Sequence, residues 1–300
     1  MNEFACEVRA GLSKPQKELP SKYLYDELGS ALFDAITVLP EYGLTRADQR
    51  VLDRCAGEIP REFPLVAEFG SGSGRKTRAV LEALEAERYV PIDLSASALE
   101  RCRRELHGLA EIELLEASYL QGLDHIVRNG GPMLVLFLGS TIGNFDARCR
   151  GDFLRQARAR MRAGDAMLIG FDLIKPVETM LDAYDDPCGV TASFNLNLLG
   201  RIDRELGGDF NLRAFSHEAR YDAGERRIEM HLRALADQEV TIREACFACR
   251  FRCGETIWTE SSHKFDAGEI PEIARGCGFE SEAQWIDREW PFAENLWRAI

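Results

Sequence analysis

The sequence predicts a doubly wound α/β fold, in which a parallel sheet carries helices on both faces, with an α+β region inserted late in the chain. Three observations support this prediction. From residue 65 onward, short apolar runs alternate with stretches of helical periodicity. A glycine-rich turn follows the first apolar run. After Lys175-Pro176 the rhythm changes to half-polar segments that alternate with a period of two.

The alternating part begins at residue 65. Its most apolar run, residues 133–138, is expected at the centre of the sheet, because a strand covered on both faces lacks polar positions. Right-handed crossovers would make these strands parallel. In chain order, strands are expected at residues 65–69, 89–92, 112–115, 133–138 and 166–171, and helices at residues 76–86, 96–106 and 148–161.

The later part is expected to form a second domain. Its polar strands alternate as in a half-exposed antiparallel sheet, and the tail then returns to the first domain. We expect a helix at 193–206 and strands at 226–234, 239–243 and 256–262, followed by a helix at 268–277 and strands at 283–287 and 290–297. The predicted domains are 48–173 with 265–300, which binds a cofactor, and 1–47 with 174–264, which binds a substrate.

The composition indicates a soluble globular protein with a small-molecule substrate. The chain has 300 residues, is 45% hydrophobic and carries a formal net charge of -13, which would repel a nucleic acid. The apolar runs are too short to cross a membrane, and residues 1–7 lack the basic and apolar order of a secretory signal. We therefore expect a cytoplasmic protein without a membrane or nucleic-acid partner. A monomer is compatible with the sequence, which does not define the oligomeric state.

The nine cysteines are expected to be reduced thiols in that compartment. Cys246, Cys249 and Cys253 have a spacing that could hold zinc or an iron-sulfur cluster. On a strand, however, Cys246 and Cys249 would face opposite sides, and a fourth ligand is not evident nearby. We therefore expect no metal site.

The turn after residues 65–69 predicts a cofactor site. Its glycines alternate as Gly70-x-Gly72-x-Gly74 after Glu68, and an acid, Asp93, ends the next apolar run, where it could accept the hydroxyl protons of a ribose. A dinucleotide fingerprint would need G-x-G-x-x-G, whereas Arg75 stands at the position of the third glycine. A phosphate-binding loop would need glycine directly before Lys-Thr. The pattern E-x-G-x-G-x-G therefore favours S-adenosylmethionine.

Three other groups of residues could hold a substrate, although each also has an ordinary structural interpretation. The loop 139–145 follows the expected central strand and contains Asn144, which could clamp a carboxylate or cap a turn. A period of two places Trp258, Glu260 and Ser262 on one strand face, which could equally be a solvated face. Aromatic side chains gather near the amino terminus and suit a cation, or simply pack; they are Tyr23, Tyr25, Phe33 and Tyr42.

The chain resembles the ergothioneine-pathway histidine Nα-methyltransferase family over nearly its whole length. The resemblance is carried by residues 19–33 (LPSKYLYDELGSALF), 39–46 (LPEYGLTR), 137–144 (FLGSTIGN), 184–186 (YDD), 194–198 (FNLNL), 227–231 (RIEMH) and 258–265 (WTESSHKF). It implies a Rossmann-like class I methyltransferase sheet with an inserted α+β substrate-binding domain. It also implies that S-adenosylmethionine successively trimethylates the α-amino group of histidine.

The resemblance also implies roles for individual residues of the substrate site. Tyr25 corresponds to the phenol beside the reacting amine and is the candidate catalytic residue. The other positions correspond to substrate-binding residues: Phe33 and Tyr42 around the amine, Asn144 and Tyr184 at the α-carboxylate, Gly139 in the pocket wall, Glu260 and Ser262 at the imidazole, and Met230 beside that ring.

The cofactor-binding positions implied by the resemblance are Gly70, Ser71, Gly72, Lys76, Asp93 and Ser118. At Ser118 the family usually has an acid that meets the adenine amine, and here the nearby acid is Glu116. The chain also has Gly43-Leu44 where the family usually has Tyr-Pro. Three alternatives therefore stay open: the same chemistry on another amino acid or amine such as tryptophan or tyrosine, a dinucleotide oxidoreductase, and a non-catalytic ligand-binding module.

Overall fold

The computed structural model describes residues 2–300, and the chain divides into two compact units. One unit contains the chain up to Gly43 together with Lys175–Ser262, and the other contains Leu44–Ile174 together with His263–Ile300. The sequence-based boundaries lay at residues 47/48, 173/174 and 264/265. We call the first the α+β unit and the second the α/β unit, and describe each by itself.

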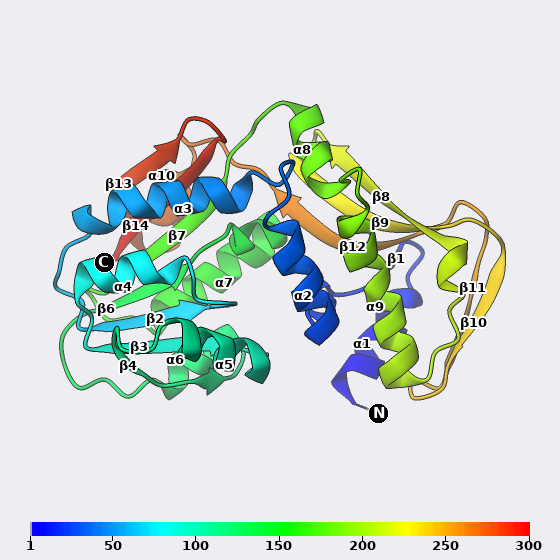
Figure 1. The fold of residues 1–300 in the computed structure, drawn as a ribbon, viewed down its shortest axis with the longest axis horizontal. Helices are drawn as coiled ribbons and strands as arrows, with labels where there is room; N and C mark the ends of the chain where they lie inside the picture. Colours follow the sequence, from blue (N-terminus) through cyan, green and yellow to red (C-terminus); the bar gives the residue numbers. More distant parts are fainter. Residues whose placement is uncertain (1) are drawn as a thin grey trace. The chain divides into compact units, whose positions relative to one another are not determined.

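The α/β unit is built on one sheet of mainly parallel strands (Figure 1). The strand order is β13-β14-β7-β6-β2-β3-β4, and β5 also pairs with β3. The bounds are β2 Leu65–Phe69, β3 Arg88–Asp93, β4 Glu111–Ile112, β5 Leu115–Glu116, β6 Met133–Phe137, β7 Ala166–Asp172, β13 Phe279–Asp287 and β14 Phe292–Ala299. The predicted doubly wound α/β class and the central position of residues 133–138 are confirmed.

The strands between residues 65 and 172 are parallel, as predicted, and one detail of them was wrong. The tail strands, for which no direction was predicted, add an antiparallel edge, because β14 runs antiparallel to both β7 and β13. The connection between β13 and β14 is only a few residues long, and such a connection can join antiparallel strands alone. The expected strand 112–115 is two short segments that pair with β3 in one register. Pro91 lies opposite the break and has no N–H to donate there.

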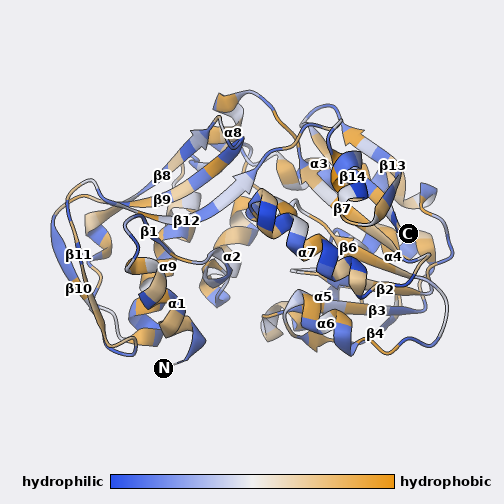
Figure 2. Ribbon diagram, turned by 180° about the vertical axis from the view of Figure 1, so that it is seen from behind, coloured by the Kyte–Doolittle hydropathy of each residue, from blue (hydrophilic) through white to orange (hydrophobic). Residues whose placement is uncertain are grey.

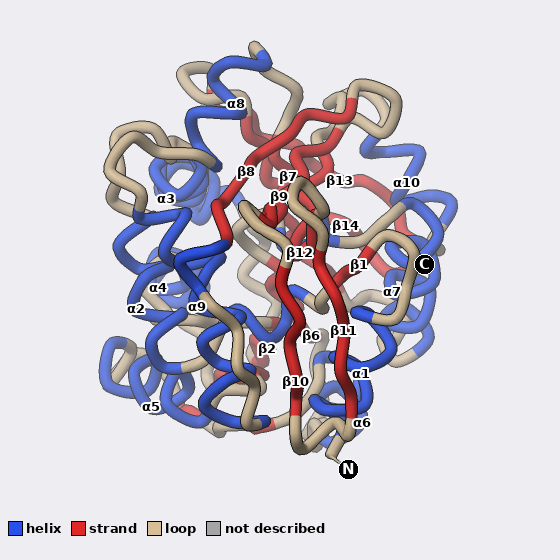
Figure 3. The backbone as a smooth tube through the Cα atoms, turned by 90° about the vertical axis from the view of Figure 1, so that its right-hand side faces the viewer, coloured by secondary structure: helices blue, strands red, loops and turns tan. Residues whose placement is uncertain are grey.

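Helices cover both faces of this sheet. In Figure 3, α3, α4 and α5 lie on one face and α6, α7 and α10 on the other. Hydrophobic and hydrophilic residues alternate along α7 in Figure 2, as expected for a helix that covers a core. The bounds are α3 Leu44–Cys55, α4 Thr77–Leu84, α5 Ala96–Glu105, α6 Tyr119–His125, α7 Ala147–Ala159 and α10 Ile270–Gly276, with 3₁₀ helices at Ala56–Glu58 (η2) and Thr141–Asn144 (η3).

The α+β unit contains a four-stranded sheet, in the order β1-β12-β9-β8, and a separate pair, β10-β11. Within the larger sheet β8 and β9 are antiparallel, whereas β1 and β12 are parallel. Its elements are α1 Glu3–Leu12, β1 Lys17–Glu18, η1 Ser21–Leu24, α2 Glu27–Ile36, α8 Val177–Tyr184, α9 Val190–Leu206, η4 Leu212–Ala214, β8 Phe215–Asp222, β9 Arg227–Ala234, β10 Gln238–Ile242, β11 Phe247–Phe251 and β12 Thr256–His263.

The prediction for the inserted strands was therefore partly wrong. Residues 239–243 were expected in the same sheet as 226–234 and 256–262, but β10 pairs with β11, which lay outside the predicted strands. Cys246, which lay outside the predicted strands, occupies the turn between β10 and β11, with φ 47°. Nine cysteines are free, and among residues 2–300 no group of His, Cys, Asp and Glu side chains could hold a metal ion.

None of the helices within residues 2–300 is both long enough and apolar enough to cross a membrane.

Candidate functional site

The glycine turn of the α/β unit connects β2 to α4. Gly70, Gly72 and Gly74 have φ values of 67°, 52° and 76°, which lie in the left-handed region that favours glycine. A Cβ on Gly70 would lie 2.9 Å from the Tyr119 hydroxyl oxygen, whereas a Cβ on Gly72 would have no atom within 4 Å. Tyr119 therefore packs against the turn at Gly70, whereas the space beside Gly72 is open. A ligand can approach the backbone at Gly72.

Glu68, the acid before the turn, has a structural role. Its buried carboxylate accepts hydrogen bonds from the Thr77 hydroxyl at 2.7 Å and from the Tyr89 hydroxyl. Burial raises the pKa of Glu68 above its ordinary value, against the effect of these donors. Glu68 therefore joins β2 to β3 and to the start of α4, and so fixes the two ends of the glycine turn.

Polar groups suited to a ribose or adenine lie along the same edge of the sheet. Asp93 ends β3, where it pairs in register with Glu116 of β5, and its carboxylate accepts the Ser95 N–H at 2.9 Å. Burial raises the pKa of Asp93. The Ser71 hydroxyl is buried in the turn, next to the Cys102 thiol. Ser118 precedes α6, is exposed, and its hydroxyl donates to Gln121 at 2.7 Å.

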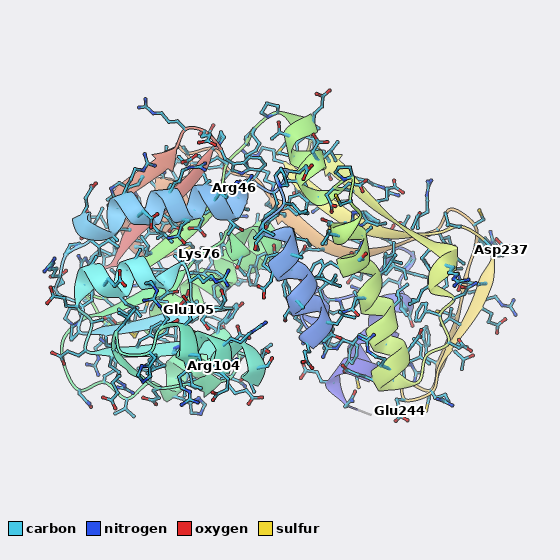
Figure 4. The ribbon with its side chains drawn as sticks, in the orientation of Figure 1. Arg46, Lys76, Arg104, Glu105, Asp237 and Glu244 are labelled. Atoms are coloured by element: carbon cyan, nitrogen blue, oxygen red, sulfur yellow. The ribbon has the colours of Figure 1, made fainter. Side chains whose placement is uncertain are left out.

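Lys76 and Gly139 meet at one carboxylate. The Lys76 Nζ donates to Asp48 Oδ2 at 2.6 Å, and the Gly139 N–H donates to the same oxygen at 3.1 Å. Figure 4 labels Lys76 at the amino end of α4. Burial disfavours the Lys76 charge, but Asp48 outweighs this effect and raises the Lys76 pKa. Asp48 was not among the predicted site residues, because in the sequence it is one of many acids on an amphipathic helix.

Asn144 ends the 3₁₀ helix after β6, in the loop that contains Gly139. This loop is braced by His263, whose Nδ1 lies 2.8 Å from the Gly143 carbonyl oxygen. Backbone strain marks the loop, because Ser140 has φ 59° and its hydroxyl accepts the Asp172 N–H at 2.8 Å. Gly139 and Asn144 thus belong to the α/β unit, on a loop at the carboxyl end of β6, where α/β sheets bind ligands.

A chain of aromatic rings occupies the α+β unit. The Tyr25 and Phe33 ring centroids are 5.4 Å apart, those of Phe33 and Tyr42 6.3 Å, and those of Tyr42 and Tyr184 6.1 Å, all near edge-to-face. Phe194 of α9 completes the group, 5.4 Å from Tyr25 and 5.9 Å from Phe33. The structure therefore brings together four of the predicted site residues and adds Phe194, whose only sequence signal was its place in the run 194–198.

Ser262 joins this aromatic group through a hydrogen bond. The Tyr184 hydroxyl donates to the Ser262 Oγ at 2.7 Å, and both side chains are buried. Glu260, two residues earlier on β12, is half-buried, and its backbone carbonyl accepts the Trp258 indole N–H at 2.9 Å. Met230 on β9 is buried, and its carbonyl accepts the Thr259 hydroxyl at 3.0 Å.

His217 and Asn195 position Tyr184 and were missed in the sequence. The His217 Nε2 lies 2.7 Å from the Tyr184 carbonyl oxygen, and its Nδ1 lies 2.9 Å from the Asn195 amide nitrogen. Asn195 also donates to the His231 carbonyl at 3.1 Å. These contacts join α8, α9, β8 and β9. No local pattern could have identified them, because the partners are far apart in the chain.

A hollow of about 570 Å³ lies at the other edge of the α/β sheet, beside the residues that precede β6 and β7. It is lined by Arg128 and Arg298, but Arg128 is paired with Asp165 and Arg298 with Glu282. The predicted site residues do not line it, and it is not part of the candidate site.

The two units therefore offer different chemistry. The α/β unit has an open glycine turn and a strand-end carboxylate, which fit an adenosine-bearing cofactor. The α+β unit has phenols and aromatic rings, which suit an ammonium group, and the Glu260 carboxylate on the same chain segment as Ser262.

Known proteins resemble the chain over almost all of its length. Residues 4–299 match the family model described as histidine-specific methyltransferase, SAM-dependent. The histidine N-alpha-methyltransferases of Mycobacterium tuberculosis and Mycolicibacterium smegmatis are 40% and 38% identical, each alignment covering 97% of this chain and 93% of the relative.

A third relative, ergothioneine biosynthesis protein 1 of Schizosaccharomyces pombe, is 30% identical, and its alignment covers 85% of this chain and 35% of that protein. The family match and the mycobacterial alignments include both units, and so both the glycine turn and the aromatic group. The chain belongs to the family of histidine-specific, S-adenosylmethionine-dependent methyltransferases.

Proposed function

We propose that this enzyme transfers methyl groups from S-adenosylmethionine to the α-amino nitrogen of L-histidine and repeats the transfer until the nitrogen is trimethylated. The family assignment and the similarity to two histidine N-alpha-methyltransferases support the reaction. The observation that carries the substrate assignment is the Tyr184–Ser262 hydrogen bond, which connects the aromatic group to the strand of Glu260. Trimethylation is consistent with the ergothioneine protein among the relatives.

In this proposal the α/β unit holds the cofactor. Gly70, Ser71 and Gly72 form the turn against which it lies, and Asp93 accepts the ribose hydroxyl protons. Lys76 faces its carboxylate, and the segment at Ser118 meets the adenine. The bound cofactor supplies a methyl group on a sulfonium, which is already activated for in-line displacement. The protein is thus left mainly with the task of alignment.

The predicted substrate residues divide between the two ends of histidine. Glu260 accepts one imidazole N–H, Ser262 meets the other nitrogen, and Met230 lies beside the ring. Asn144 and Tyr184 bind the α-carboxylate, and Gly139 lines the pocket. A substrate without two ring nitrogens would leave these polar groups unpaired, so the proposal makes the ring the main determinant of selectivity.

The reacting amine lies in this proposal among Tyr25, Phe33 and Tyr42. An α-amino group is largely protonated at neutral pH, so Tyr25 orients the amine and accepts or relays its proton. As methyl groups are added, the hydrogen bonds to the nitrogen disappear and a fixed positive charge remains. Aromatic ring faces stabilise such a cation, which permits several transfers in one pocket.

We propose that the enzyme acts in the cytoplasm, because its nine cysteines are free, as in reducing compartments. Its partner is its small-molecule substrate, and a monomer is compatible with the sequence.

The direct test is mass spectrometry of reactions that contain S-adenosylmethionine and one amine. The panel contains histidine, its mono- and dimethylated forms, tryptophan and tyrosine. We expect histidine and both methylated forms to converge on the trimethylated product, and the other two amino acids to stay unchanged. Methylation of tryptophan or tyrosine in preference to histidine would contradict the substrate assignment.

Glu260→Ala tests the imidazole interaction. We expect kcat/KM for histidine to fall about 10- to 100-fold, which corresponds to the loss of a hydrogen bond to a charged group. Selectivity against tryptophan should decrease in parallel. Steady-state kinetics on both amino acids measure the change. Glu239→Ala is the matched control, because Glu239 of β10 is exposed and forms an ion pair with Arg250 of β11. An unaltered kcat/KM for histidine in Glu260→Ala contradicts the assignment.

A further inference from the structure

Two carboxyl groups are buried together in the α/β unit. Asp48 of α3 and Glu294 of β14 both have 0% of their surface exposed. Glu294 pairs in register with Gly170 of β7, and a Cβ on Gly170 would lie 2.7 Å from Glu294 Oε1. The Glu294 carboxyl group thus fills the space that any larger residue at position 170 would need.

The hydrogen-bond donors around this pair all go to one oxygen. Asp48 Oδ2 accepts from Lys76 Nζ and from the Gly139 N–H. Asp48 Oδ1 and both oxygens of Glu294 are buried and meet no donor within residues 2–300. Three buried carboxylate oxygens without a donor would greatly lower the free energy of unfolding, since each oxygen loses its hydrogen bonds to water and gains none in the folded protein.

A proton on Glu294 removes this difficulty. The two carboxyl groups are neighbours, because a Cβ on Gly170 would lie 2.7 Å from Glu294 Oε1 and 3.3 Å from the Gly139 nitrogen, which donates to Asp48. Two neighbouring buried carboxyl groups interact favourably only if one of them donates a hydrogen bond to the other. Burial, and then the neighbouring Asp48, raise the pKa of Glu294 far above its ordinary value. Asp48 is the better anion of the two because the Lys76 ammonium and a backbone N–H already stabilise its charge.

The other titratable groups that face this pair do not supply the missing donor. Glu68, on β2, accepts hydrogen bonds from the Thr77 and Tyr89 hydroxyl groups and donates none to this pair. Cys55, on α3, keeps its proton because burial raises the pKa of its thiol, but within residues 2–300 it makes no hydrogen bond to Asp48 Oδ1 or to either oxygen of Glu294. A neutral Glu294 therefore leaves Asp48 and Lys76 as a balanced ion pair, whereas an ionised Glu294 would leave a net negative charge in a buried site.

We propose that Glu294 is a positioning residue for the cofactor site: it keeps its proton, donates it in a hydrogen bond to Asp48 Oδ1, and so holds Asp48 where it orients Lys76 and Gly139. The Lys76 side chain is 28% exposed, whereas the Asp48 side chain that binds its ammonium is fully buried, so the ammonium is anchored on the interior side. Gly139 has φ 72°, and a Cβ there would lie 2.8 Å from Lys76 Nζ, so a larger residue would strain the backbone and displace the ammonium. The role in cofactor binding rests on the function proposed above.

The test compares two replacements of Glu294. Glu294→Gln keeps the size and supplies an N–H donor, whereas Glu294→Leu removes the donor. Calorimetric titration with S-adenosylhomocysteine should give a Kd within about threefold of wild type for Glu294→Gln, and a Kd at least tenfold higher for Glu294→Leu. The KM for S-adenosylmethionine should follow the Kd, with a smaller change in kcat. The exposed Glu282 of β13, replaced by Gln, is the matched control and should leave binding unchanged.

Infrared difference spectroscopy of wild type against Glu294→Gln tests the proton itself, even if Glu294→Leu does not fold. We expect the band of a protonated carboxyl group in wild type at pH 8 and its loss in Glu294→Gln. Absence of the band, or equal loss of affinity in the Gln and Leu variants, overturns the proposal. Failure of the wild type to bind S-adenosylhomocysteine would instead overturn the proposed function, while the infrared band still decides the protonation of Glu294.

Discussion

At the residue scale, the aromatic side chains of the α+β unit combine packing and chemistry in different proportions. Phe33 and Phe194 offer ring faces alone, whereas Tyr184 uses its hydroxyl to bind Ser262. Tyr25 packs edge-on against both phenylalanines, so its ring is held independently of its hydroxyl. A substitution that removes only the Tyr25 hydroxyl therefore separates the two contributions.

Tyr25→Phe should fold normally and turn over slowly. The ring contacts are kept, while the group that orients the amine and accepts its proton is lost, so we expect kcat to fall about 100-fold, in the range of general acid–base effects. Single-turnover mass spectrometry with histidine measures the rate and the mixture of methylated products. A time course identical to wild type would remove Tyr25 from the mechanism.

At the element scale, one buried acid anchors the amino ends of β6 and β7. Asp165 accepts the Met133 N–H at 2.8 Å, the Arg162 N–H at 2.7 Å and two Arg128 donors at 2.7 and 2.9 Å. Burial by itself would raise the Asp165 pKa, but the Arg128 and backbone donors outweigh it and lower the pKa. The central strands of the sheet therefore begin at a fixed point.

Asp165→Asn should destabilise the enzyme and change its response to acid. A lowered folded-state pKa contributes stability that is present above the unfolded pKa of about 4 and is lost as pH falls through the folded value. We expect the free energy of unfolding to fall by about 3 kcal/mol at pH 7, since Arg128 loses a buried partner, and by less at pH 3. Denaturant unfolding at both pH values measures this.

Asp152→Asn is the control for that experiment, because Asp152 forms an exposed pair with Arg155 on α7. Such pairs contribute about 0.5 kcal/mol or less. A loss in Asp165→Asn that is no larger than in this control, or that is equal at the two pH values, would contradict the role assigned to Asp165.

At the scale of the whole molecule, the net charge of -13 and the family assignment agree on a small-molecule enzyme. The dinucleotide oxidoreductase alternative makes a different prediction about which ligand stabilises the fold. A ligand that binds only the folded state adds about 2.7 kcal/mol at a concentration of 100 Kd.

S-adenosylhomocysteine at that concentration should therefore raise the midpoint of thermal unfolding by about 5 °C. NAD at the same concentration should leave the midpoint within error of the free protein. Differential scanning calorimetry with each ligand measures the two shifts. Stabilisation by NAD alone would favour the oxidoreductase interpretation.

The α/β class, most of its strands and the cofactor turn could be predicted from the sequence, because they depend on neighbouring residues. Apolar runs identify β2, β6 and β7, and three glycines at alternate positions identify the turn. The break between β4 and β5 could not, because it depends on Pro91 in a neighbouring strand. The pairing of β10 with β11 could not be predicted for a similar reason. The alternation of apolar and polar residues indicates a strand, but it does not indicate which strand pairs with it.

Local order along the chain was thus sufficient for the fold class, the family resemblance and the candidate residues. Only the folded chain brings Tyr184 to Ser262, which are 78 residues apart, and Gly139 to Asp48, which are 91 apart. The Asp48–Glu294 pair likewise exists only after α3 packs near β14. The physical reason is that hydrogen bonds, burial and shared protons depend on distance in space, whereas periodicity and motifs depend on distance along the sequence.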